Sequence, residues 1–253
     1  MSSPTALALF EEAREELRNA IDREIPLDKE KKAFRSVLDI ITSSFAPAST
    51  SGGRHGGFEG GLTCHTRDVW SLASRMAAQS VDVFLPRIQT ASRGGSEYDR
   101  EDLETGMAGV SQASVLKVCI IHDLNKVSTF DGKPHYIPNA GVKKVGAKLW
   151  KVNPDSEVSP TIKRSLAEIG MEDHPVIGLL SGKSVQIRDG QVSLATAYAM
   201  VPELKGMLSE EEEFAVVYHD GAFVSLRDGL MSKNSALQII LHAADMIASR
   251  FFC

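Results

Sequence analysis

The segment that most constrains the fold is the run of residues 115–124, which is apolar on nearly every side of a helix. A helix without a polar face must be covered by other elements, so we expect residues 107–127 to form a central, buried helix. His122 and Asp123 interrupt the run as neighbours. Burying such a pair is costly unless it is paired, hydrogen-bonded or bound to metal. The pair is therefore a candidate ligand pair, with a satisfied pair of core residues as the alternative.

Further helices are predicted on both sides of this central segment. Apolar residues recur at helical spacing in the N-terminal part and again at the C-terminus. Ser209 and Glu212 form a capping-box pattern at the start of one segment, and Pro86 is expected to stop another. The expected helices span residues 5–21, 27–45, 62–84, 107–127, 209–218 and 234–252.

The segments between these helices are less regular. Residues 46–61 contain six glycines and predict a loop, and residues 87–106 predict a polar surface loop. Residues 135–137 and 148–150 are expected to pair as a short hairpin, and residues 185–192 to form two short strands about a turn. We expect an all-α fold with a small irregular or β-hairpin insertion, in one domain over residues 1–253. Its N-terminal helices would occupy residues 1–45 and its core residues 54–252, with the insertion at about 131–207.

Composition excludes several classes of protein. The chain has 253 residues, of which 43% are hydrophobic, and this is enough for a sizeable core. It has no apolar stretch of membrane-spanning length and no basic, apolar leader, so we expect no membrane span and no signal peptide. Three cysteines without a CxxC pair are typical of a reducing compartment, and we expect a cytoplasmic protein. The net charge of −5 argues against a protein that coats long nucleic acid.

Two further ligand-type residues interrupt apolar helices. His65 stands just after the glycine-rich loop, and Asp245 lies within the final helix. With His122 and Asp123 they would supply two imidazoles and two carboxylates from separate helices. Such a set in a bundle core suits a divalent transition metal with positions left open for water or substrate. Spacing along the chain leaves open whether the four residues converge.

The order of these four residues resembles the H…HD…D pattern of the HD-domain metal-dependent phosphohydrolase superfamily. The surrounding motifs are similar too: residues 60–66 (GGLTCHT) resemble GGL-x-x-H-(S/T), residues 121–126 (IHDLNK) resemble the HD-(L/I)-x-K segment, and residues 241–245 (LHAAD) resemble L-H-x-(A/V)-D.

A finer similarity covers residues 54–252. It is to HD proteins of bacteriophages and mobile elements that are related to the HD domain of bacterial 3′–5′ exoribonucleases. His55 precedes the Gly-Gly-Leu run as in that group, and residues 212–221 (EEFAVVYHDG) resemble its E-x-x-A-I-x-x-H-x-G segment. Residues 181–184 (SGKS) lack a histidine that the group often has there. Residues 186–202 look like extra sequence, which implies an unusual lid over the site.

The resemblance implies a role for each site residue. His65, His122, Asp123 and Asp245 would hold one divalent ion (Mn, Mg, Fe, Co, Ni or Zn) that activates a water molecule for attack on phosphorus.

Residues outside this ligand set have alternatives. Lys126, one turn after the ligand pair, would contact a phosphate; otherwise it is a surface lysine at a helix C-terminus. His219 would be a second-metal ligand or general acid; otherwise it forms a hydrogen bond at a helix end. Arg54 and His55 would bind phosphate, or belong to a solvated loop.

Three features of the sequence carry less weight. Cys64 and Cys119 are expected to pack under the site rather than bind zinc. The glycines and lysine of residues 178–184 are one residue short of a phosphate-binding loop. His242 lies on the same helix face as Asp245 and is expected to orient a ligand carboxylate.

The resemblance implies an enzyme that cleaves a phosphoester or phosphoanhydride of a small nucleotide with metal-activated water. A 3′–5′ exonuclease on single-stranded nucleic acid is one alternative, but it needs a basic, aromatic-lined groove of which the sequence gives little sign. A non-catalytic nucleotide-binding module is the other, against which the four intact ligands count. The expected partner is a small phosphorylated substrate, with nucleic acid less favoured, no membrane, and the oligomeric state open. A phage-encoded protein would act in the host cytoplasm.

Overall fold

The structure of the chain is a computed structural model, and it describes residues 4–49, 56–91, 110–127, 134, 136–139, 150–153, 189–219 and 235–251. These residues form helices with one small hairpin, which confirms the predicted fold class. None of the helices in these ranges has an apolar stretch long enough to cross a membrane. The assignment of the whole chain to one domain stays a prediction.

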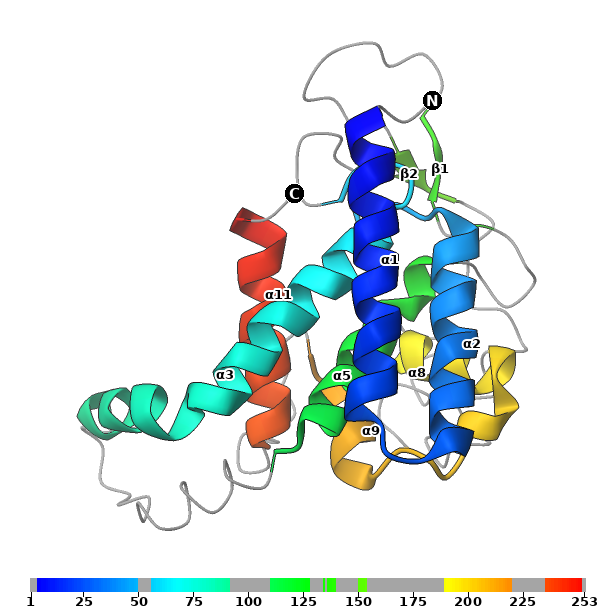
Figure 1. Cartoon of the computed structure of the whole chain (residues 1–253). Helices are drawn as coiled ribbons and strands as arrows, with labels where there is room; N and C mark the ends of the chain where they lie inside the picture. Colours follow the sequence, from blue (N-terminus) through cyan, green and yellow to red (C-terminus); the bar gives the residue numbers. More distant parts are fainter. Residues whose placement is uncertain are drawn as a thin grey trace, which may run out of the picture.

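Two N-terminal helices lie side by side along one face of the molecule (Figure 1). They are α1 (Pro4–Glu24) and α2 (Asp28–Ser44), close to the predicted ranges. Each is amphipathic and buries one stripe, with Leu17 and Phe34 fully covered. Both helices contact α5 (Gln112–Ile121), so they cover one side of the central helix.

The central helix is α5, as its apolar run predicts. All seven residues from 115 to 121 are buried, and α5 contacts α1, α2, α3, α8, α9 and α11. The side chain of Ser111 caps its N-terminus by accepting a hydrogen bond from the Ser114 N–H. The helix is shorter than predicted, because it ends at Ile121 and a 3₁₀ turn, η1 (Leu124–Lys126), follows. Residues 107–109 lie outside the described ranges.

Helix α3 (Gly61–Ala91) begins where the sequence predicts and extends further. The expectation that Pro86 stops this helix was wrong, since the helix continues to Ala91. A proline removes one backbone hydrogen bond and disturbs one turn, which a long helix can accommodate. Residues 87–91 of the predicted loop are therefore helical, and residues 92–106 lie outside the described ranges.

Helix α8 (Asp189–Met200) corrects the prediction of two short strands. Residues 189–192, expected to be part of a pair of strands, form its first turn. Gly190 packs there so closely on α9 (Glu210–Val217) that a Cβ atom would lie 2.0 Å from the Val216 carbonyl oxygen. Tertiary packing thus overrides the local strand pattern. Leu194 and Ala197 are fully buried, so part of the segment that looks like extra sequence belongs to the core, and the lid stays a prediction.

The remaining elements agree with the sequence. Turn η2 (Pro202–Leu204) follows α8, and α9 begins with the predicted capping box of Ser209 and Glu212. The last helix, α11 (Ala236–Phe251), crosses α3 (Figure 1). Strands β1 (Tyr136–Pro138) and β2 (Trp150–Val152) pair antiparallel, one to two residues further along the chain than predicted.

Candidate metal centre

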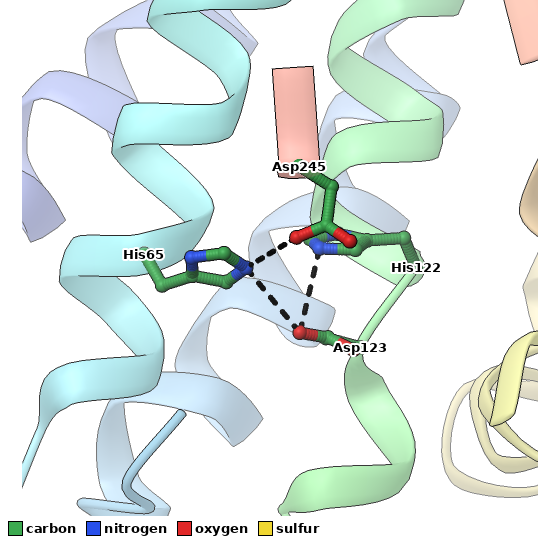
Figure 2. A group of neighbouring side chains, drawn as sticks. All are labelled: His65, His122, Asp123 and Asp245. Atoms are coloured by element: carbon green, nitrogen blue, oxygen red, sulfur yellow. Dashed lines mark ion pairs between the residues drawn. The ribbon is translucent and has the colours of Figure 1, made fainter. Parts of the chain in front are cut away.

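The four predicted ligands converge in the structure, as Figure 2 shows. His65 comes from the first turns of α3, His122 and Asp123 from the end of α5, and Asp245 from α11. Each residue offers one ligand atom, and these atoms all lie within 4.8 Å of one another. The three helices that carry them contact each other directly. Sequence reasoning left this convergence open, and the packing of α3, α5 and α11 provides it.

The end of α5 lets two adjacent residues face the same point. Neighbours on a continuous helix diverge by about 100° and could not share a ligand. His122 keeps helical backbone angles, whereas Asp123 has φ −115° and ψ 18° and leaves the helix. Both side chains therefore turn into the cluster, where His122 Nε2 lies 3.5 Å from Asp123 Oδ2.

The ring of His122 is held in one orientation. Its Nδ1 donates a hydrogen bond of 2.7 Å to the carbonyl oxygen of Cys119, one turn back on α5. The proton therefore sits on Nδ1, and the lone pair of Nε2 is directed toward the cluster. Among the described residues Nε2 has no hydrogen-bond partner, although it is fully buried. A buried acceptor of this kind suits a metal ligand.

His65 lies between the two carboxylates. Its Nε2 is 3.1 Å from Asp245 Oδ1 and 3.4 Å from Asp123 Oδ2. Burial alone would lower the pKa of His65, but hydrogen bonds and charges from Asp123 and Asp245 raise it to about 9. His122 differs, since burial outweighs the carboxylates and lowers its pKa to about 4. In the ion-free protein a protonated His65 thus balances part of the negative charge.

Lys126 supplies the second positive charge. It stands on η1, three residues after Asp123, and its ammonium forms an ion pair with the Asp123 carboxylate. Burial opposes the charged carboxylate of Asp123, yet Lys126, His122 and His65 hold its pKa well below the usual range. The Lys126 side chain is only 15% exposed, so it is not a surface lysine. Lys126 therefore contacts the carboxylate of a candidate ligand, and its side chain has little access to solvent.

His219 reaches the same cluster from the end of α9. Its Nδ1 donates a hydrogen bond of 2.8 Å to the Val216 carbonyl, which is the helix-end bond that the sequence suggested. The same bond turns Nε2 inward, to 4.0 Å from Asp123 Oδ1. The ring meets that of His122 edge-on at 5.3 Å. The two alternatives for His219 are thus compatible.

The supporting contacts are only partly those that the sequence suggested. His242, expected to orient a carboxylate, instead donates from Nδ1 to the His219 carbonyl oxygen at 2.8 Å. Ser249 donates to Asp245 at 3.1 Å, a contact that the i+4 spacing on α11 could have indicated.

A second missed contact holds the turn that carries Lys126. The hydroxyl of Ser193 on α8 accepts a hydrogen bond from the Asn125 N–H at 3.1 Å and donates to its side chain at 2.9 Å. These residues are 68 positions apart, and no sequence signal connects them.

Several other candidates lie elsewhere. Cys64 and Cys119 are buried, and burial raises the pKa of the Cys64 thiol to about 11. Neither belongs to the ligand group found in the described ranges, which agrees with the expected packing role. Arg54, His55 and residues 178–184 lie outside the described residues.

The donor set can therefore hold a metal ion. Two imidazole nitrogens and two carboxylate oxygens suit a divalent first-row ion better than an all-oxygen or all-sulfur site would. In comparisons with known proteins, no family model matches the chain, and neither does any curated protein or solved structure. The resemblance to the HD superfamily thus stands on the motifs alone.

Proposed function

We propose that this chain is a metal-dependent phosphohydrolase that cleaves a phosphoester or phosphoanhydride bond of a small nucleotide. The observation that supports the proposal best is the buried convergence of His65, His122, Asp123 and Asp245 from three helices. The similarity of their motifs to the HD superfamily supports it as well. When bound, a divalent ion supplies a water of lowered pKa and polarises a phosphoryl oxygen.

In this proposal His65, His122, Asp123 and Asp245 hold the ion. The bond from His122 Nδ1 to the Cys119 carbonyl fixes the ligand tautomer before the ion arrives. Lys126 binds an oxygen of the transferred phosphoryl group. Its ammonium already lies against Asp123, and the Asn125–Ser193 hydrogen bonds hold its turn against α8.

His219 is the proposed general acid. Because its Nδ1–H donates to the Val216 carbonyl, Nε2 is the nitrogen that faces the cluster, 4.0 Å from Asp123, and the doubly protonated ring would give up its proton from this atom. The bond from His242 to the His219 carbonyl steadies this residue where α9 ends. His219 would pass the proton to the leaving oxygen of the substrate.

The net charge of −5 favours a small substrate over a polyanion. The test incubates the protein with nucleoside mono-, di- and triphosphates and with a single-stranded oligonucleotide, in the presence of Mn²⁺, Mg²⁺, Co²⁺ or Ni²⁺. The readout is released phosphate or a longer phosphate chain for the nucleotides, and shortened strands with free nucleotides for the oligonucleotide. We expect turnover of a nucleotide. Cleavage of the oligonucleotide alone would contradict the proposed substrate class in favour of an exonuclease.

Two matched variants assign the activity to the site. Asp123→Asn should lower turnover by roughly 10²-fold or more, because it removes a ligand charge. Asp39→Asn makes the same chemical change on a side chain that is 63% exposed, and it should leave turnover unchanged. Equal turnover in the two variants would show that the cluster is not the active site.

A further inference from the structure

A cavity of about 550 Å³ lies directly beside the candidate metal centre. Lys126 lines one part of it and also forms the ion pair with Asp123, so the cavity and the metal centre share this side chain. The other walls come from the end of α2, the glycine-rich segment and the β-hairpin, with Phe45, Glu59, Tyr136 and Trp150 among the lining residues. This volume falls within the range of about 300–1,000 Å³ typical of small-molecule sites.

Phe45 is an unusual residue for its position. It is the only non-glycine residue in the described ranges with positive φ, at 49°, and it caps the C-terminus of α2 through a bond from its N–H to Thr42. Glycine or asparagine is preferred there, since a bulky side chain strains this conformation. Phe45 nevertheless remains 47% exposed as a residue, and its ring stacks on that of Phe10 with the ring centres 4.9 Å apart. Backbone geometry therefore does not explain why a phenylalanine stands at the cavity.

The wall formed by the hairpin is also aromatic, and it is held in place. Trp150 of β2 donates a hydrogen bond from its indole nitrogen to the Gly57 carbonyl at 3.1 Å. This bond joins the hairpin to the glycine-rich segment, and β1 places Tyr136 on the same cavity. Within the described lining, the cavity thus offers three aromatic rings and two charged groups, Lys126 and Glu59.

We propose that this cavity binds the base of a nucleoside phosphate, which places its phosphate at Lys126. The proposal rests on the proposed function and names the part of the substrate that the metal centre does not contact. The Glu59 carboxylate would repel a phosphate, so the anionic end belongs at Lys126, next to Asp123. Aromatic side chains stack on the faces of bases, and a carboxylate accepts hydrogen bonds from amino or hydroxyl groups. A sugar phosphate without a base would leave the rings unused.

The test compares each nucleoside 5′-monophosphate with ribose 5-phosphate on the Mn²⁺-loaded protein. The readout is the ratio of kcat/KM for the nucleotide to kcat/KM for the sugar phosphate. We expect a ratio of about ten or more for at least one base, from stacking. Phe45→Asn should lower this ratio about tenfold. Asparagine suits the positive φ, so the variant should fold.

Leu27→Asn is the matched control for this change. It removes an apolar side chain that is 49% exposed at the other end of the same helix, and the ratio should stay within about twofold. Equal kcat/KM for ribose 5-phosphate and every nucleotide would overturn the inference and leave the proposed function standing. An unchanged ratio of the two kcat/KM values in Phe45→Asn would also overturn the inference and leave the proposed function standing.

A binding measurement separates this inference from the proposed function. In a Trp70→Phe background, Trp150 is the only tryptophan, and its fluorescence reports on the cavity. If neither ribose 5-phosphate nor any nucleoside mono-, di- or triphosphate is hydrolysed, the proposed function fails. Quenching by a nucleotide and not by ribose 5-phosphate would still support the base pocket, whereas no difference between the two ligands would overturn it.

Discussion

Lys117 provides the sharpest test of how the helices around the candidate metal centre are held together. This side chain of the central helix α5 is 10% exposed, and its ammonium lies 3.1 Å from Glu30 of α2 and 3.7 Å from Glu212 of α9. It also donates to the Met207 carbonyl at 3.3 Å. One cation thus joins α5 to two of its covering helices, and we predict that Lys117→Met destabilises the fold.

The expected loss follows from what the substitution leaves behind. Methionine keeps most of the apolar stem, but Glu212, whose side chain is 5% exposed, loses its cation. Removing one partner of a buried pair costs about 3–5 kcal/mol. Glu212 keeps its bond to the Ser209 N–H at 2.9 Å, and Glu30 lies nearer to water, so we expect the lower end, about 3 kcal/mol. This corresponds to a fall in Tm of roughly 6–12 °C.

Urea-induced unfolding of the wild type and Lys117→Met measures this difference. The double variant Lys117→Met with Glu212→Gln removes the stranded charge as well, and it should recover part of the lost stability. A loss below about 0.5 kcal/mol in Lys117→Met would refute the reasoning, because it would show that the buried carboxylates do not need the cation.

Three further predictions concern separate parts of the molecule. Leu27 occupies the N-cap of α2 without a capping bond, so Leu27→Asn should raise the free energy of unfolding by about 1 kcal/mol in urea titrations. Gly190→Ala should lower Tm and separate α8 from α9, seen as faster amide exchange there, because its Cβ would meet the Val216 oxygen. Metal binding at pH 7 should release about one proton, because His65, with a pKa of about 9, is protonated before the ion binds and His122, with a pKa of about 4, is not. The affinity for the metal should therefore rise with pH up to about 9. Calorimetry in buffers of different ionisation enthalpy counts the released protons. Zero protons released would contradict the proposed charge balance.

Much of the fold could be predicted because it depends on local patterns. The apolar run around Cys119 requires a covered helix, and the Ser209–Glu212 capping box marks the start of another. The errors occurred where packing decides the outcome. A long helix continues through Pro86, and the contact of Gly190 with α9 makes a helix of a segment with a strand pattern.

The candidate site divides in the same way. The candidate ligand residues could be found from residue type and motif, since isolated His and Asp residues in apolar helices are costly without a role. Their supports could not, because the bond between Asn125 and Ser193 and that between His242 and the His219 carbonyl depend on how distant helices pack. The cavity could not be predicted for the same reason, since the hairpin and the end of α2, far apart in the sequence, line it together.

The central claim is that His65, His122, Asp123 and Asp245 form a metal site. The most direct test is the metal content of the purified protein, incubated with Mn²⁺, desalted and measured by mass spectrometry. We predict roughly one ion per chain in the wild type and in Asp39→Asn, and a loss of it in Asp123→Asn. A wild type without bound metal, or an Asp123→Asn variant that retains it in full, would contradict the claim.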